Sequence, residues 1–400
     1  MLTHKSRTKE IPASGSLLFG FLLLFAISLP LTGVSTVLSY GLVLVVYVAL
    51  SLFAVRYTST IIISRVYMAL ICLLSSSIVL SGIIFPSVGS LARIGGFFIF
   101  TLANLLFAPS VIPFRYLTFL ASRYAAGLIV LGFLPYLGIQ SLFGLFDLSL
   151  WGGYLYLYPE LSPIRSIFSN PNALGFVLLV GVTAALIEAI RTRRRIAVAL
   201  VLFNSIGLLF TNYRTGMISF VIVLSLYSVY VLFNQRTYTA AVVGGLTTSV
   251  LLLLAMFGLV PGPTWLTELS LNGRRELWRE TAMAIREAPL FGVGFGNYPT
   301  VVNNPHNSYL RMFLALGLGG GLVYLFIVLR SILQSARNTT DWKLLGISLY
   351  LVAFFFVQML NSLTFVGISF HSAIISLLIG YHIRSDSLSA GKATMGTGDI

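Results

Sequence analysis

Long runs of apolar residues, separated by short polar stretches, dominate the chain. A run of about 20 apolar residues lets a helix cross the hydrocarbon core of a bilayer. The runs are continuous rather than alternating, which excludes the strands of a membrane β-barrel. The pattern therefore predicts an all-α polytopic membrane protein of about twelve transmembrane helices. The expected spans lie near 16–31, 34–55, 66–84, 91–108, 124–143, 172–190, 196–212, 216–233, 238–259, 308–329, 344–363 and 367–383.

Composition agrees with the apolar pattern. The 400 residues are 57% hydrophobic and only 9% charged, whereas soluble domains carry about a quarter charged residues. The first apolar run follows Lys5, Arg7 and Lys9 as in a signal peptide, but no small-residue cleavage site closes it, so we expect an uncleaved first helix. Cys72, the single cysteine, can form no internal disulfide. We expect one membrane domain over residues 1–400.

The basic residues predict the orientation. Seventeen of the 25 Lys and Arg residues fall on one side of the predicted spans if both termini are cytoplasmic, as the positive-inside rule requires. Residues 384–400 are then a cytoplasmic tail, and two long loops, 144–171 and 260–307, lie outside a cytoplasmic (inner) membrane. The net charge of +14 thus reflects topology, and we expect the bilayer, and no nucleic acid, as a partner.

Eight arginines lie on the predicted outer side, against the orientation signal, so we expect them to have another purpose. The planar guanidinium suits bidentate binding of phosphate or carboxylate. Such a set fits a diphosphate-binding face, although some members could instead pair with Glu276, Glu280 or Glu287. The eight are Arg93, Arg165, Arg214, Arg274, Arg275, Arg279, Arg286 and Arg311.

The stretch 271–311 is the most polar segment between apolar runs. A helix is predicted over 274–288, outside the membrane, and Pro289 ends it. Three glycines between 292 and 296 predict a flexible turn. The face of the helix expected to pack consists of Leu277, Trp278, Ala282 and Ile285.

His306 is the strongest catalytic candidate in this stretch. Asn307 can cap the tenth span, which places His306 just outside a helix N-terminus. The positive end of that helix disfavours imidazolium, so the ring stays neutral and can accept a proton. The alternative is a loop histidine at the bilayer interface. No second His or Cys stands at ligand spacing, so we expect no metal.

Two shorter motifs share the predicted outer side. Asn170-Pro171-Asn172 opens the sixth span, where Pro171 suits the first helical position. The stretch 211–216 makes a tight turn that carries Arg214. An arginine near the membrane is costly to bury, so it is expected to face a partner inside the protein or to extend toward lipid headgroups.

These motifs have a recognisable order along the chain. They comprise Arg165, Phe168 and Asn170-Pro171-Asn172; Thr211, Arg214 and Gly216; Gly273-Arg274, Glu276 and Trp278; Pro289-Leu290-Phe291-Gly292-Val293-Gly294; His306-Asn307 and Leu310; and Gly317 and Gly319. Over residues 165 to 330 the set resembles the O-antigen ligase and polymerase family, integral-membrane enzymes that move glycans from polyprenyl diphosphate carriers. Two positions depart from the family pattern: Tyr213 replaces a serine before Arg214, and Ile167 replaces a glycine before Phe168.

The resemblance implies a metal-independent, cofactor-free inverting glycosyltransferase at the outer face of the cytoplasmic membrane. The donor would be a polyprenyl-diphosphate-linked glycan, and the acceptor a hydroxyl of a glycolipid or glycan, with ligation to lipid A-core as the first expectation. His306 would act as general base, while Arg274 and Arg214 would hold the diphosphate. The substrate-binding residues would be Arg165, Asn172, Arg275, Asn307 and Arg311.

Other functions remain open at this point. Within the family, the chain could be an O-antigen or capsular polysaccharide polymerase, or could transfer glycans to a protein hydroxyl. Outside it, twelve spans with both ends inside also suit a flippase or transporter of lipid-linked sugars. That function predicts two related halves with polar breaks near the midplane, and no such repeat is evident between 16–190 and 196–383.

Overall fold

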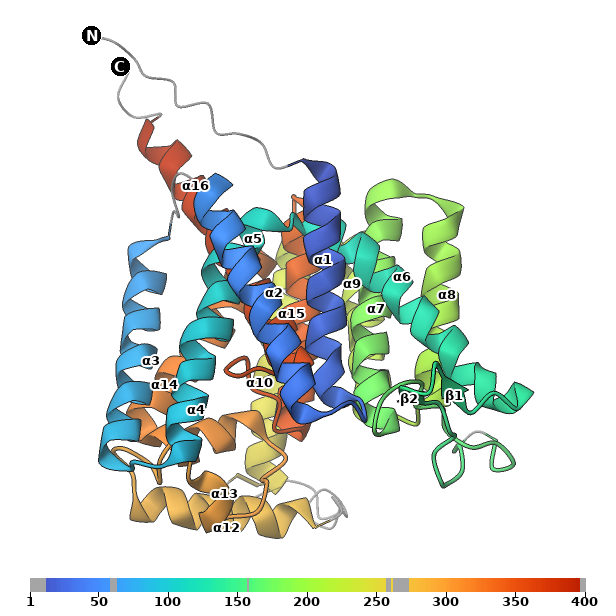
Figure 1. Ribbon diagram of the computed structural model, residues 1–400. Helices are drawn as coiled ribbons and strands as arrows, with labels where there is room; N and C mark the ends of the chain where they lie inside the picture. Colours follow the sequence, from blue (N-terminus) through green and yellow to red (C-terminus); the bar gives the residue numbers. More distant parts are fainter. Residues whose placement is uncertain (1–11, 58–62, 157, 257–259, 262–272, 396–400) are drawn as a thin grey trace. The chain divides into compact units, whose positions relative to one another are not determined.

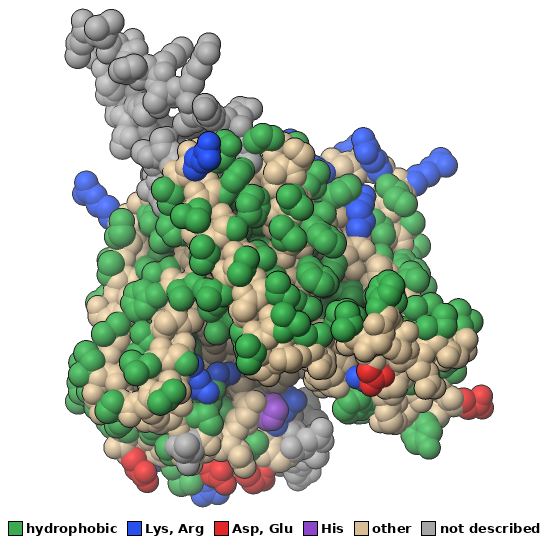
Figure 2. All heavy atoms as spheres, in the orientation of Figure 1, with side chains coloured by type: hydrophobic (Ala, Val, Ile, Leu, Met, Phe, Trp, Pro, Cys, Tyr) green, Lys and Arg blue, Asp and Glu red, His purple; other side chains and the backbone are tan. Residues whose placement is uncertain are grey.

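The structure is a computed structural model that describes the chain except for residues 1–11, 58–62, 157, 257–259, 262–272 and 396–400. Within the described residues, ten helices are long and apolar enough to cross a membrane. The shorter apolar helix α8 (Arg195–Phe210) and the last helix α16 (Phe370–Met395) correspond to the two further predicted spans. The prediction of an all-α polytopic membrane protein is confirmed. Hydrophobic side chains cover most of the face drawn in Figure 2, as lipid contact requires.

Contacts group the residues into two compact units. The first unit comprises Met1–Ile63, Phe97–Phe220 and Phe365–Ile400, and the second Ser64–Gly96 and Val221–Thr364. Helices of the first unit, besides α8 and α16, are α1 (Ala13–Ser28), α2 (Thr36–Tyr57), α5 (Ala108–Val111), α6 (Phe114–Phe133) and α7 (Pro171–Thr192), with short η1 (Leu29–Leu31), η2 (Phe97–Thr101), η3 (Ala103–Phe107) and η4 (Leu134–Leu137); α9 (Arg214–Leu232) starts there.

Helix α7 is the core of the first unit and packs against both α6 and α8; all three are labelled in Figure 1. Every residue from Ala173 to Glu188 is buried. Asn170 caps the helix by accepting a hydrogen bond from the Ala173 backbone N–H at 2.9 Å, and Pro171 occupies the first turn, as predicted. The first unit also holds a two-stranded hairpin, β1 (Ser141–Leu142) with β2 (Phe146–Asp147).

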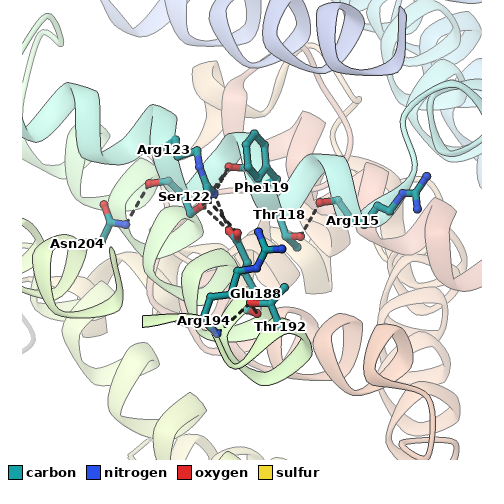
Figure 3. A network of polar contacts seen from close by, with 9 residues as sticks. All are labelled: Arg115, Thr118, Phe119, Ser122, Arg123, Glu188, Thr192, Arg194 and Asn204. Carbon is teal, nitrogen blue, oxygen red and sulfur yellow. Dashed lines mark hydrogen bonds and ion pairs between the residues drawn. The ribbon is translucent and has the colours of Figure 1, made fainter. Parts of the chain in front are cut away.

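A buried carboxylate joins these three helices (Figure 3). Glu188 of α7 accepts two hydrogen bonds from the Arg123 guanidinium of α6, at 2.6 and 3.0 Å. The Ser122 hydroxyl lies 3.3 Å from the same carboxylate, and Asn204 of α8 donates to the Ser122 carbonyl at 3.1 Å. Burying a carboxylate is costly unless it is paired and hydrogen-bonded, and this network supplies both.

The second unit contains α3 (Arg65–Ile84), α4 (Val88–Gly96), α10 (Gln235–Met256), α12 (Arg274–Glu287), α13 (Tyr298–Val301), α14 (Ser308–Arg337) and α15 (Trp342–Leu360). Helix α14 is interrupted at Gly317, whose φ of 68° and ψ of −171° are not helical. The turn 289–296 packs into this interruption. The Leu318 backbone N–H donates to the Pro289 carbonyl and the Val293 N–H to the Leu314 carbonyl, both at 2.8 Å.

Two glycines make this packing possible. A Cβ at Gly292 would lie 2.3 Å from the Leu314 carbonyl oxygen, and one at Gly317 would lie 2.4 Å from the Leu290 carbonyl oxygen. Both residues also have positive φ, which favours glycine. The predicted flexible turn is therefore a fixed element, because its backbone packs directly against the backbone of a broken helix.

This packing predicts that Gly292→Ala disrupts the polar segment. The added Cβ meets backbone that cannot rotate away, and a non-glycine residue at positive φ adds strain of about 1–3 kcal/mol. We expect a lower unfolding temperature and faster proteolysis between residues 273 and 307. Gly319→Ala is the matched control, because a Cβ there meets nothing within 4 Å. Equal stability of the two variants would contradict the direct packing of the Gly292 backbone against α14.

Candidate functional site

Helix α12 is fastened to the loop that carries His306. The Trp278 indole N–H donates to the Pro305 carbonyl, and the Trp278 side chain is 1% exposed. Arg274 lies one turn earlier on α12, so this anchor sets its position relative to His306. In Figure 1, α12 lies across the end of the second unit at which α3 and α4 are joined.

The buried face of α12 differs in part from the predicted one. Trp278 is buried as expected, but Thr281 and Ala284 complete the face instead of Ala282 and Ile285. The Thr281 hydroxyl donates to the Leu277 carbonyl at 2.6 Å. This internal bond satisfies the polar group, so a threonine can occupy a buried position.

Asn307 caps α14 as predicted. Its side-chain oxygen accepts from the backbone N–H groups of Tyr309 and Leu310, each at 3.0 Å. Its amide nitrogen donates to the Met359 carbonyl, also at 3.0 Å. Because both polar atoms of its side chain form hydrogen bonds, Asn307 is fixed. The preceding His306 is therefore held at the N-terminus of α14.

His306 is half-buried and has a positive φ of 48°. Such backbone is sparsely populated by residues other than glycine, and strain of this kind clusters at functional sites. The pKa of the imidazole is lowered, first by burial and second by the positive charge of Arg274. The ring is therefore neutral near pH 7 and able to accept a proton.

The lowered pKa can be measured directly. In protein labelled at histidine, we expect the NMR titration of His306, identified by its loss in His306→Gln, to have its midpoint below the ordinary value of about 6.5. Arg274→Gln should move this midpoint upward, because removing a nearby positive charge favours imidazolium. Arg279→Gln, on an exposed face of the same helix, is the control. An unchanged midpoint in Arg274→Gln would show that the charge of Arg274 does not lower the pKa of His306.

Two further arginines of the second unit share one aromatic ring. The Arg93 guanidinium lies 4.8 Å from the centroid of the Tyr298 ring, and that of Arg311 lies 4.6 Å from the same centroid. Arg93 also donates to the Phe295 carbonyl and Arg311 to the Ser362 carbonyl. Within the described residues, the ion pairs found do not involve either arginine. The pair therefore concentrates positive charge beside Tyr298.

The first unit holds Arg214 at the start of α9. Its guanidinium lies 3.8 Å from the centroid of the Tyr156 ring. The preceding Tyr213 is 4% exposed and packs where a Cβ on Gly175 or Gly216 would fall, within 2.3 Å. The tyrosine thus fills space that the two glycines leave, which explains how it is accommodated in the turn.

Arg165 and Asn172 lie elsewhere in the first unit. Arg165 forms an ion pair with Asp147 and donates to the carbonyls of Ser149 at 2.8 Å and Phe168 at 3.0 Å. Hydrogen bonds from Ser149, and then the charge of Arg165, lower the pKa of Asp147. Arg165 therefore joins two parts of the loop before α7, while Asn172 is exposed on the first turn of that helix.

Comparison with protein-family models matches residues 196–325 to the family described as O-antigen ligase. The similarity to that family covers less than half of the 400 residues. No curated protein sequence matches the chain. The match supports a glycosyltransferase-like function in polysaccharide synthesis, and the apolar helices show a multi-pass membrane protein.

The matched segment, residues 196–325, contains most of the predicted site residues. Arg274, His306, Asn307 and Arg311 lie together in the second unit, and exposed Arg275 lies beside Arg274 on α12. Arg214 is in the domain but belongs to the first unit, whereas Arg165 and Asn172 precede residue 196. The catalytic and substrate-binding roles of all these residues stay predictions.

The contacts that two tyrosines make with arginines were not predicted. Tyr298 contacts Arg93 and Arg311, and Tyr156, which precedes the matched segment, contacts Arg214. Arg93 was counted only among the outer arginines. A tyrosine in a loop carries no signal of its own in a chain with 19 of them, so only the spatial neighbours reveal these pairs.

Proposed function

We propose that the protein transfers a glycan from a polyprenyl diphosphate carrier to an acceptor sugar hydroxyl at the outer face of the cytoplasmic membrane. The observation that carries this proposal is the placement of His306 within the electrostatic reach of Arg274, with the Trp278 anchor and the Asn307 cap holding the two segments. A neutral base beside a fixed positive charge suits attack by a hydroxyl on a carbon that bears an anionic leaving group.

In the proposed reaction, the acceptor hydroxyl oxygen attacks the anomeric carbon of the donor glycan. Its proton passes to the His306 imidazole as the new C–O bond forms. The bond between the anomeric carbon and the diphosphate oxygen breaks, and the electron pair leaves with the diphosphate. Arg274 stabilises that growing charge without a metal ion. Direct attack inverts the anomeric centre.

The remaining predicted residues have supporting parts in this proposal. Arg275 and Arg311 add positive charge in the second unit, and the Arg93–Tyr298–Arg311 cluster can hold an anionic group of either substrate. Arg214 is proposed as a further diphosphate ligand. The polyprenyl chain of the proposed donor lies in the bilayer, which suits a protein with many apolar helices.

Ligation to lipid A-core is the proposed reaction among the family alternatives. The test is a strain that lacks the gene, examined for its surface and carrier-linked glycans. Ligation predicts unsubstituted core together with long glycans that accumulate on the carrier. Single repeat units on the core would instead indicate a polymerase. Carrier-linked glycan retained on the cytoplasmic side would indicate a flippase and overturn the proposal.

A further inference from the structure

The outer loop of the first unit presents a row of exposed tyrosines. Tyr154, Tyr156 and Tyr158 are 75%, 64% and 61% exposed, whereas Leu155 between the first two is 3% exposed. The segment thus uses a leucine to attach to the protein and directs its aromatic rings outward.

This segment belongs to a closed loop, residues 151–156 and 158–163, which we name the tyrosine loop. Backbone N–H groups of Trp151 and Leu155 donate to the carbonyls of Pro163 and Leu161, at 3.0 and 2.9 Å. The Tyr136 hydroxyl donates to the Ser162 carbonyl at 2.6 Å. The rings are therefore carried on an ordered support, which lowers the entropy lost when a ligand binds.

The tyrosine loop is fastened directly to the turn that carries Arg214. The Asn212 amide nitrogen donates to the Tyr154 carbonyl at 2.7 Å, and the Asn212 side-chain oxygen accepts from the Tyr156 N–H at 3.2 Å. The Arg214 guanidinium stacks on the Tyr156 ring. One end of the tyrosine row is thus set beside the arginine that the proposed function assigns to the diphosphate.

We propose that the tyrosine loop is a binding surface for the glycan of the donor, an inference that rests on the proposed function. Sugar rings present apolar C–H faces edged by hydroxyls, and tyrosine offers an apolar ring with a polar hydroxyl. A glycan whose diphosphate lies at Arg214 meets Tyr156 first and then its exposed neighbours. The loop holds several sugar units without reading one hydroxyl pattern.

A lipid surface is the competing occupant, since Tyr and Trp also gather at membrane interfaces. The neighbouring hairpin offers a contrast within the same unit. Phe143 and Leu145 at its tip are 86% and 72% exposed and carry no polar group, which is what lipid contact favours. The three tyrosines, each with a hydroxyl and one with a stacked guanidinium, favour a hydroxylated ligand.

The test measures binding of an oligosaccharide released by mild acid from the strain's own surface polysaccharide. Saturation-transfer NMR with the full-length protein in nanodiscs gives the dissociation constant. We expect Tyr154→Leu/Tyr158→Leu to weaken binding about 10-fold, because two stacking contacts are lost. Tyr154→Phe/Tyr158→Phe should weaken binding by no more than about 3-fold, because the stacking rings stay and only the hydroxyl contacts are lost. Leucine keeps the apolar area, so a surface for lipid alone would tolerate it.

Controls separate this inference from the proposed function. Phe143→Ala/Leu145→Ala should bind the oligosaccharide as the wild type does, and so should His306→Ala, because binding needs no base. Equal binding by the leucine variant and the wild type, or no detectable binding by the wild type, would overturn the tyrosine-loop assignment and leave glycan transfer intact. Normal transfer by His306→Ala would instead remove His306 as the proposed base, and absence of transfer by the wild type would overturn the proposed function.

Discussion

His306→Ala is expected to lower the rate of glycan transfer by about 10²–10⁴-fold, the usual contribution of a general base. The imidazole takes the acceptor proton only as the new bond forms, so kcat should fall while KM stays near its original value. The measurement is the initial rate with purified protein in nanodiscs, a polyprenyl-diphosphate-linked glycan as donor and lipid A-core as acceptor.

Two comparisons show whether the loss is chemical. Asn303→Ala changes an exposed residue of the same loop and should leave the rate near that of the wild type. The unfolding temperature of His306→Ala should also stay close to the original, because the imidazole is only half-buried and the cap at Asn307 is unchanged. A rate within about 3-fold of the wild type would reject His306 as the base, since a base contributes at least about 10².

The local signals in the sequence predicted the elements that carry this site. Asn307 could be recognised as a helix cap, and Pro289 as the residue after a helix, because both effects act through neighbouring backbone groups. The structure places the start of α14 at Ser308 and the end of α12 at Glu287 accordingly. Hydrophobic run length was sufficient to predict the membrane class, because the length needed to cross a bilayer is also a property of each segment by itself.

Contacts between distant segments could not be predicted in this way. Gly292 and Gly317 are far apart in sequence, and nothing local shows that their backbones meet. The ring of Tyr298 meets arginines from α4 and α14, so three segments must be placed before the cluster exists. The buried face of α12 was misassigned because hydrophobicity ranks Thr281 below Ala282, whereas its hydroxyl is satisfied within the helix.

Glu188→Leu is expected to destabilise the protein by about 3 kcal/mol, at the low end of the range for breaking a buried ion pair. The substitution leaves the Arg123 guanidinium without its carboxylate in the packing between α6 and α7 (Figure 3). The side chain of Arg123 is 32% exposed and that of Glu188 only 4%, so the arginine can regain some hydration by extending outward. That relief is the reason for the low end of the range.

The double variant Arg123→Leu/Glu188→Leu decides what the pair contributes. Replacing both charges with apolar groups is often neutral or stabilising, so we expect it to recover most of the stability that Glu188→Leu loses. Arg115→Leu removes an exposed charge from the same helix and should change stability by less than about 0.5 kcal/mol. The free energy of unfolding in mixed micelles gives all three values. A double variant no more stable than Glu188→Leu would show that shape and hydrogen bonding to Ser122, rather than charge compensation, hold α6 against α7.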